Sequence, residues 1–110
     1  MEHTAVFDVI GDPKDKLINV DLDGTLCTGD YWGGKNEPKP NKEMIAKVQE
    51  WFDMGAHIII WTGRQPRLYP DTLAWLIKHR VPFHGISMQT KLGADAYIID
   101  DRVIRPEEIL

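Results

Sequence analysis

The sequence predicts an α/β fold, a three-layer sandwich around a central parallel sheet, and two observations predict it. Short apolar segments alternate with helical segments, the order that gives parallel strands joined by right-handed crossover helices on both faces of a sheet. Polar residues follow these apolar segments where each one ends, and ligands of open parallel sheets gather at the carboxyl ends of strands. A chain of 110 residues is expected to form a single domain with one modest core.

The amino-terminal part of the chain is the least regular. Residues 1–15 are expected to form an N-terminal extension or an edge strand over Ala5–Ile10, followed by a turn at Gly11–Asp15. The apolar run Leu17–Val20 then predicts the first buried strand. Residues 27–40 contain several glycines and prolines and lack a helical period, so they predict a flap loop or a small hairpin.

The middle of the chain carries the clearest helix and the clearest strand. Asn41 offers an N-cap, apolar residues repeat with helical spacing from Met44 to Phe52, and Gly55 stands at the C-terminal cap position. Ala56–Trp61 is rich in β-branched residues and apolar on both faces, as expected of a central parallel strand.

The last third of the chain continues the alternation. A second helix is expected from about Asp71 to Arg80, because apolar residues recur on one side of it and a proline follows. Phe83–Met88 then predicts a third strand and Ala96–Ile99 a fourth.

Composition limits the class of protein. With 43% hydrophobic and 27% charged residues, the chain is expected to be an ordinary globule without a membrane span. Met1–Thr4 lacks the basic start of a secretory signal and the single Cys27 cannot form an internal disulfide, so a cytoplasmic location is expected. A formal charge of -4 argues against non-specific nucleic-acid binding.

Polar residues at the predicted strand ends form an ordered series. An acid, leucine, acid, glycine, threonine run follows the first strand, a threonine ends the second, a lysine opens the link to the last strand, and two aspartates end that strand. The series consists of Asp21, Leu22, Asp23, Gly24, Thr25, Thr62, Lys91, Asp100 and Asp101. In this order and strand context it resembles the four motifs of the haloacid dehalogenase-like superfamily, in its small capless phosphatase type. The resemblance covers residues 17–102.

The resemblance implies an enzyme, a phosphomonoester hydrolase that works through an aspartyl-phosphate. Asp21 would be the nucleophile and Asp23 the general acid and base. Thr62 would donate its hydroxyl to phosphate, and Lys91 would supply a positive charge beside the nucleophile.

The phosphate would also meet backbone groups, with N–H donors around Leu22 and Gly63. Arg64 is placed to grip a phosphate or substrate through its guanidinium, and it could equally pair with an acid. Both interpretations of Arg64 stay open at this point.

The implied cofactor is Mg²⁺, which prefers oxygen ligands. Its expected ligands are the Asp21 carboxylate, the Asp23 backbone carbonyl and one carboxylate of the pair Asp100 and Asp101, with Asp101 the first choice.

The spacing of the motifs leaves no room for the cap domain that many relatives insert. An open site suits a macromolecular substrate, such as a nucleic-acid end or a phosphoprotein, or a small one enclosed by a neighbouring subunit of a homo-oligomer. Sugar phosphates and nucleotides therefore stay open as substrates as well, and the loop after Thr25 together with Arg64–Tyr69 is expected to set specificity.

Two other classes compete with the enzyme. A phospho-accepting regulatory domain of the receiver type also uses a parallel sheet, Mg²⁺, an aspartate, a threonine and a lysine, but it places its acid pair first. A non-catalytic binding module could keep the same type of fold, although it would not need all of these polar residues together.

Overall fold

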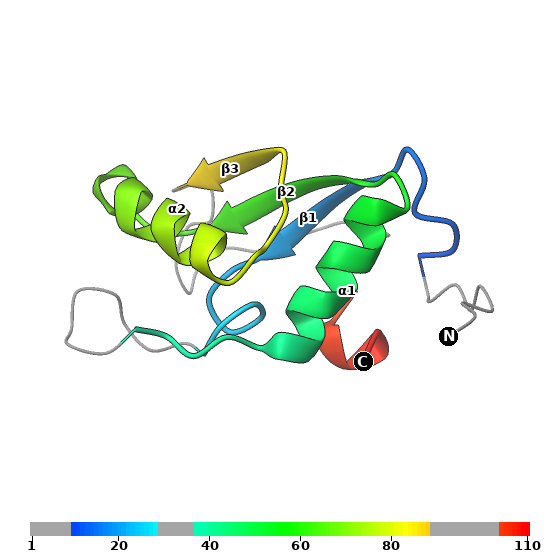
Figure 1. The fold of residues 1–110 in the computed structure, drawn as a ribbon, viewed down its shortest axis with the longest axis horizontal. Helices are drawn as coiled ribbons and strands as arrows, with labels where there is room; N and C mark the ends of the chain where they lie inside the picture. The colour runs from blue at the N-terminus through cyan, green and yellow to red at the C-terminus, as the bar shows by residue number, and fades with distance from the viewer. Residues whose placement is uncertain (1–9, 29–36, 89–103) are drawn as a thin grey trace.

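The computed structural model describes residues 10–28, 37–88 and 104–110. Within them, three strands form a parallel sheet in the order β1-β2-β3: β1 spans Leu17–Asp21, β2 spans His57–Thr62 and β3 spans Gly85–Met88 (Figure 1). This confirms the α/β class. The strand expected over Ala5–Ile10 falls almost wholly, and the one over Ala96–Ile99 wholly, outside the described residues.

The register of the sheet decides which side chains share a face. Val20 lies opposite Ile60, and Ile60 lies opposite Ile86. Because side chains alternate along a strand, Ile58 and Thr62 point to the same side as Ile60. Ile58, Ile60 and Thr62 are buried, whereas Leu17, on the opposite face, is 64% exposed.

Helix α1, Lys42–Asp53, follows the predicted bounds closely. The Asn41 side chain accepts the Met44 N–H at 3.2 Å, which satisfies one of the unpaired donors of the first turn. The helix ends at Met54, and Gly55 has φ +98°, a left-handed conformation that favours glycine. One apolar side of α1 is buried, through Met44, Ile45, Val48 and Trp51.

Helix α2 spans Tyr69–Lys78, two residues earlier than expected at each end. A 3-10 turn, η1 over Pro66–Leu68, leads directly into it, and prolines are well tolerated in a first helical turn. Arg80 has φ +57°, so the left-handed backbone ends the helical run before this residue. Strand β3 begins at Gly85, two residues later than expected, although the His84 N–H already bonds the Ile58 carbonyl of β2 at 2.8 Å.

Both helices lie on one side of the sheet (Figure 1). Two crossovers that step in the same direction across a sheet place their helices on one face when both are right-handed. The buried residues of α1 and α2 accordingly join Val20, Ile58 and Ile60 in a single core cluster. The described residues thus form two layers, and a third layer on the other face of the sheet stays a prediction.

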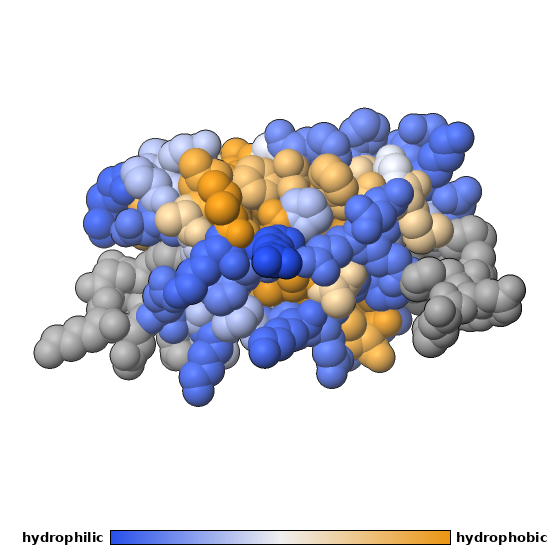
Figure 2. Space-filling view, in the orientation of Figure 1, coloured by the Kyte–Doolittle hydropathy of each residue, from blue (hydrophilic) through white to orange (hydrophobic). Residues whose placement is uncertain are grey.

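The helix-bearing face shows apolar residues across its middle with polar residues around them (Figure 2). A second 3-10 turn, Pro106–Glu108, lies near the carboxyl terminus, and Ile109 packs against the core. Among the described residues no helix is both long and apolar enough to cross a membrane.

Candidate functional site

The turn after β1 brings the first acid pair to the carboxyl edge of the sheet. The Leu22 carbonyl accepts the N–H groups of Thr25, Leu26 and Cys27 at 3.2, 2.9 and 3.3 Å, and its side chain is fully buried. Gly24 has φ +88°, a conformation that a residue with a side chain rarely adopts. The chain therefore turns tightly after β1 and stays close to the end of the sheet.

Asp21 is the last residue of β1 and lies opposite Trp61 of β2. The Thr25 hydroxyl donates to Asp21 Oδ2 at 2.9 Å. This bond orients one oxygen of the predicted nucleophile, and its donor comes from the same turn. Thr25 belongs to the motif that suggested the site, but the sequence did not indicate that it would contact Asp21.

Asp23 is held by Arg64 through both carboxylate oxygens. Arg64 Nε donates to Oδ2 at 2.9 Å, and Nη2 pairs with Oδ1. The Thr62 hydroxyl stands 3.5 Å from Asp23 Oδ2. The carboxyl ends of β1 and β2 thus meet through side chains, as expected of neighbouring parallel strands.

The end of β2 is shaped by one buried threonine. Thr62 is 1% exposed, and its Oγ1 accepts the Arg64 N–H at 3.1 Å. This bond turns the backbone at Gly63, which is exposed, and directs the Arg64 side chain back toward β1. Of the two interpretations of Arg64, the structure shows the pairing with an acid, while its contact with phosphate stays a prediction.

Arg64 is also anchored from α2. Its Nη1 donates to the Thr72 hydroxyl at 3.1 Å, and Thr72 is fully buried. Sequence reasoning missed Thr72, since a threonine in a helix gives no signal of its own. The burial of Thr72 on α2 is seen only in the structure, and it indicates a partner because a buried hydroxyl needs one.

Cys27 lies behind Asp23 and is almost fully buried. Its Sγ stands 3.7 Å from Asp23 Oδ1 and 3.6 Å from the Leu22 carbonyl oxygen. Burial, followed by the negative charge of Asp23, raises the pKa of the Cys27 thiol to about 11. The thiol is therefore protonated at neutral pH.

The two ends of the predicted flap over residues 27–40 are joined at their base. Cys27 and Pro40 form an antiparallel bridge, the Thr28 N–H donates to the Lys39 carbonyl at 2.9 Å, and the Lys39 N–H donates to the Thr28 hydroxyl at 3.1 Å. A base paired in this way fits either a loop or a small hairpin. Residues 29–36 lie outside the described ranges.

Helix α2 holds the returning end of this segment. The Trp75 indole N–H donates to the Pro38 carbonyl at 3.0 Å, in a buried contact. Lys78 and Glu37 form an exposed ion pair at 2.7 Å, and the hydrogen bond from Lys78 lowers the pKa of Glu37. The segment therefore returns to α1 along a path that α2 fixes.

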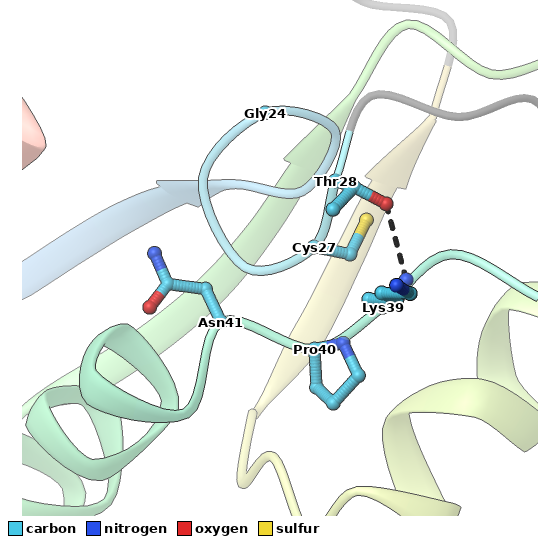
Figure 3. Close-up of a pocket in the computed structure, with 6 residues that line it drawn as sticks. All are labelled: Gly24, Cys27, Thr28, Lys39, Pro40 and Asn41. Carbon is cyan, nitrogen blue, oxygen red and sulfur yellow. Dashed lines mark hydrogen bonds between the residues drawn. The ribbon is translucent and has the colours of Figure 1, made fainter.

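A hollow opens between the turn after β1 and the base of this segment. Its volume is about 460 Å³. Gly24, Cys27, Thr28, Lys39, Pro40 and Asn41 line it (Figure 3). The hollow borders the turn that carries Asp23, on the side of Cys27.

The remaining predicted site residues are Lys91, Asp100 and Asp101, and all three lie outside the described residues. Within the part of the chain that the structure describes, no three histidine, cysteine, aspartate or glutamate side chains are grouped so as to hold a metal ion. The structure thus brings together Asp23, Thr62 and Arg64 by direct contacts, with Asp21 beside them at the end of β1.

Comparisons with known proteins place the chain among relatives. No protein-family model matches the chain, and no curated protein matches it either. A solved structure matches the chain, a structural-genomics target from Vibrio cholerae that is 32% identical in sequence. The TM-score is 0.71, and the match covers 84% of this chain and 85% of the Vibrio cholerae chain. That level of identity over most of both chains shows common descent as well as a common fold. The chain belongs to the same protein family as this Vibrio cholerae protein.

Proposed function

We propose that the protein is a Mg²⁺-dependent phosphomonoester hydrolase of the haloacid dehalogenase-like type that works through an aspartyl-phosphate. The observation that carries this proposal is the meeting of two strand ends: Asp23, from the turn after β1, contacts Thr62 and Arg64, which end β2. Polar side chains that pair with one another at the carboxyl edge of a parallel sheet are poorly explained by packing alone.

Asp21 and Asp23 have separate tasks in this reaction. An Asp21 oxygen attacks phosphorus, the bond from phosphorus to the leaving oxygen breaks, and the Asp23 carboxyl gives its proton to that oxygen. Water then attacks phosphorus as Asp23 takes its proton, and the bond from phosphorus to Asp21 breaks. The hydrogen bond from Thr25 leaves Asp21 oriented at the end of β1 and so supports its role as the nucleophile.

The phosphate oxygens need donors at the same edge. The Thr62 hydroxyl and the backbone N–H groups around Leu22 and Gly63 supply them in the proposed complex. The Leu22 side chain is fully buried, so only its backbone is available for this task. Lys91 adds the positive charge that a dianionic phosphate requires.

Two oxygen donors among the described residues are of the type that binds a magnesium ion. The Asp21 carboxylate at the end of β1 and the Asp23 carbonyl in the turn that follows are ligands of the hard oxygen type that Mg²⁺ prefers. Asp100 or Asp101, with Asp101 preferred, would complete the protein ligands. When bound, the ion neutralises charge on the transferring phosphoryl group.

The site has no cap domain of its own in this proposal, and the core is the three-layer type expected from the sequence. Between β2 and β3 the chain forms only η1, α2 and short connections, which supports this view. An open site accepts a phosphorylated macromolecular end, or a small phosphate ester enclosed by a second subunit. A cytoplasmic location fits the single, buried cysteine.

The direct test is a phosphatase screen with excess Mg²⁺, followed by chelation. The panel contains p-nitrophenyl phosphate, sugar phosphates, nucleotides, a phosphorylated oligonucleotide and a phosphopeptide. We expect turnover of at least one ester, its loss on chelation and its return when Mg²⁺ is restored. No turnover by the folded, metal-loaded protein on any member would overturn the proposal, and a phosphoenzyme that forms without turning over would favour the phospho-accepting domain.

A further inference from the structure

We propose that Arg64 is a positioning residue for Asp23 and that Thr72, on α2, fixes Arg64 for this task. The inference rests on the proposed function and assigns to Arg64 a part other than gripping the phosphate. It starts from burial: the Arg64 side chain is 6% exposed, whereas the Asp23 side chain that it contacts is 37% exposed. The guanidinium thus lies inside the protein and the carboxylate faces outward.

The guanidinium is occupied on all three of its nitrogens. Nε and Nη2 donate to the two oxygens of Asp23, and Nη1 donates to the Thr72 hydroxyl. A planar guanidinium that meets both oxygens of a carboxylate fixes its rotation as well as its position. An arginine that gripped phosphate directly would instead present this pair of donors to the open edge of the site.

Two different elements hold Arg64 in this orientation. Its backbone N–H is bonded to Thr62 at the end of β2, and its side chain is bonded to Thr72 in α2. Lysine has no planar fork and could not bond Asp23 twice while also reaching Thr72. The arrangement therefore depends on arginine in particular and on the Thr72 hydroxyl.

The contact has a consequence for proton transfer. A general acid and base must hold its oxygen within reach of both the leaving oxygen and the attacking water. Two bonds from one planar guanidinium hold both Asp23 oxygens in a fixed plane, so Arg64 sets the direction in which each oxygen faces. Arg64 thus aims the Asp23 carboxyl for proton transfer in both steps of the proposed reaction.

The test compares four variants on two substrates. Arg64→Lys removes the fork and keeps a charge, Thr72→Val removes the hydroxyl at nearly constant volume, and Thr72→Ser restores it. Arg80→Lys is the matched control, because Arg80 is exposed just beyond the other end of α2 and its described hydrogen bonds use only its backbone. The substrates are p-nitrophenyl phosphate, with a good leaving group, and an alkyl phosphate, with a poor one.

We expect Arg64→Lys to lower kcat roughly 10- to 100-fold, at or below the lower end of the range of about 10²- to 10⁴-fold that a positioned acid–base group contributes, with KM nearly unchanged. The pH profile of kcat should change shape, and the two substrates should be affected to different degrees. Thr72→Val should show the same pattern more weakly, and Thr72→Ser should recover the original activity. Arg80→Lys should match the unaltered protein.

The outcomes separate this inference from the proposed function. If Arg64→Lys raises KM and leaves kcat and the pH profile unchanged, Arg64 binds phosphate and the positioning role is wrong, although the phosphatase stands. Absence of turnover in the unaltered protein instead overturns the function itself. If Arg64→Lys does not fold, as judged by circular dichroism, Thr72→Val decides, and unchanged kcat and pH profile in that variant overturn the inference.

Discussion

The two ends of the parallel strands, here called the amino edge and the carboxyl edge of the sheet, use polar groups in different ways. At the amino edge, backbone groups bond one another: the Asp15 N–H meets the Gly55 carbonyl at 3.0 Å, and the His57 N–H meets the Lys16 carbonyl at 2.8 Å. At the carboxyl edge, side chains bond side chains, as in the contact of Asp23 with Arg64. Backbone pairing needs no particular side chain, whereas the contacts at the carboxyl edge depend on which side chains stand there.

One side chain at the amino edge shows the contrast clearly. His84 Nδ1 accepts the Ile58 N–H at 3.0 Å, and its ring stacks on Phe52 with centroids 5.0 Å apart. The imidazole there completes the start of β2. A residue type that often serves catalysis thus supports the fold at this edge.

The largest expected effect comes from a substitution at the carboxyl edge. Asp21→Asn should reduce phosphatase kcat by roughly 10³-fold or more, because an amide is a poor nucleophile, and the unfolding midpoint should change little. Asp53→Asn is the matched control, since Asp53 is exposed at the far end of α1 and should leave kcat unaltered. Steady-state kinetics and urea unfolding measure both, and normal turnover by Asp21→Asn would remove this residue as the nucleophile.

A smaller effect concerns Cys27, which lies behind the carboxyl edge. Because its pKa is raised from 9.0 to about 11, its thiolate fraction near pH 8 should be about 100-fold below that of an ordinary thiol. A chromogenic disulfide reagent should therefore label the native protein at least that much more slowly than the urea-unfolded protein. Equal rates in the two states would show that the thiol is neither buried nor protonated as described.

The raised pKa of Cys27 also makes the free energy of unfolding depend on pH. The folded state keeps the thiol proton to a higher pH than the unfolded state does, so the folded protein binds more protons between about pH 9 and 11. This contribution to stability is complete below pH 9 and is lost as the pH rises toward 11. Urea unfolding at pH 8 and pH 10.5 should show the loss, and Cys27→Ser should reduce the difference between the two pH values.

The smallest expected effect comes from a substitution at the amino edge. His84→Phe keeps a ring beside Phe52 and removes the acceptor of the Ile58 N–H, which should lower the free energy of unfolding by about 1 kcal/mol. Phosphatase kcat should not change, because His84 lies at the opposite edge from Asp21. His57→Phe is the comparison, since the described contacts of that ring are limited to His84 at 5.1 Å, and a loss of kcat in His84→Phe would contradict the division between the edges.

Local sequence signals predicted the elements better than the contacts of the site. The capping residues Asn41 and Gly55 bracket α1, and the run Ile58–Ile60 marks β2, because these signals act over a few residues. The start of α2 was wrong by two residues, since prolines at 66 and 70 were compatible with either a loop or a first helical turn.

The partner of Arg64 could not be predicted for a different reason. Asp23 and Arg64 are 41 positions apart in sequence, and their contact depends on how the turn after β1 faces the end of β2. Thr72 was still less accessible, because its hydroxyl matters only once the Arg64 side chain has turned toward α2. Sequence spacing placed Asp21, Asp23 and Thr62 at one edge, but it did not specify which side chains would pair there.

The anchoring of residues 37–40 to α2 has a consequence for how this protein can be altered. Thr28 bonds Lys39 and Trp75 bonds Pro38, so both ends of the intervening stretch are fixed by groups outside it. The entropy cost of closing a loop between fixed ends grows only slowly with its length, by about 0.6 kcal/mol per doubling. Natural variation or protein engineering could therefore lengthen or replace this stretch while the sheet and its two acids stay in place.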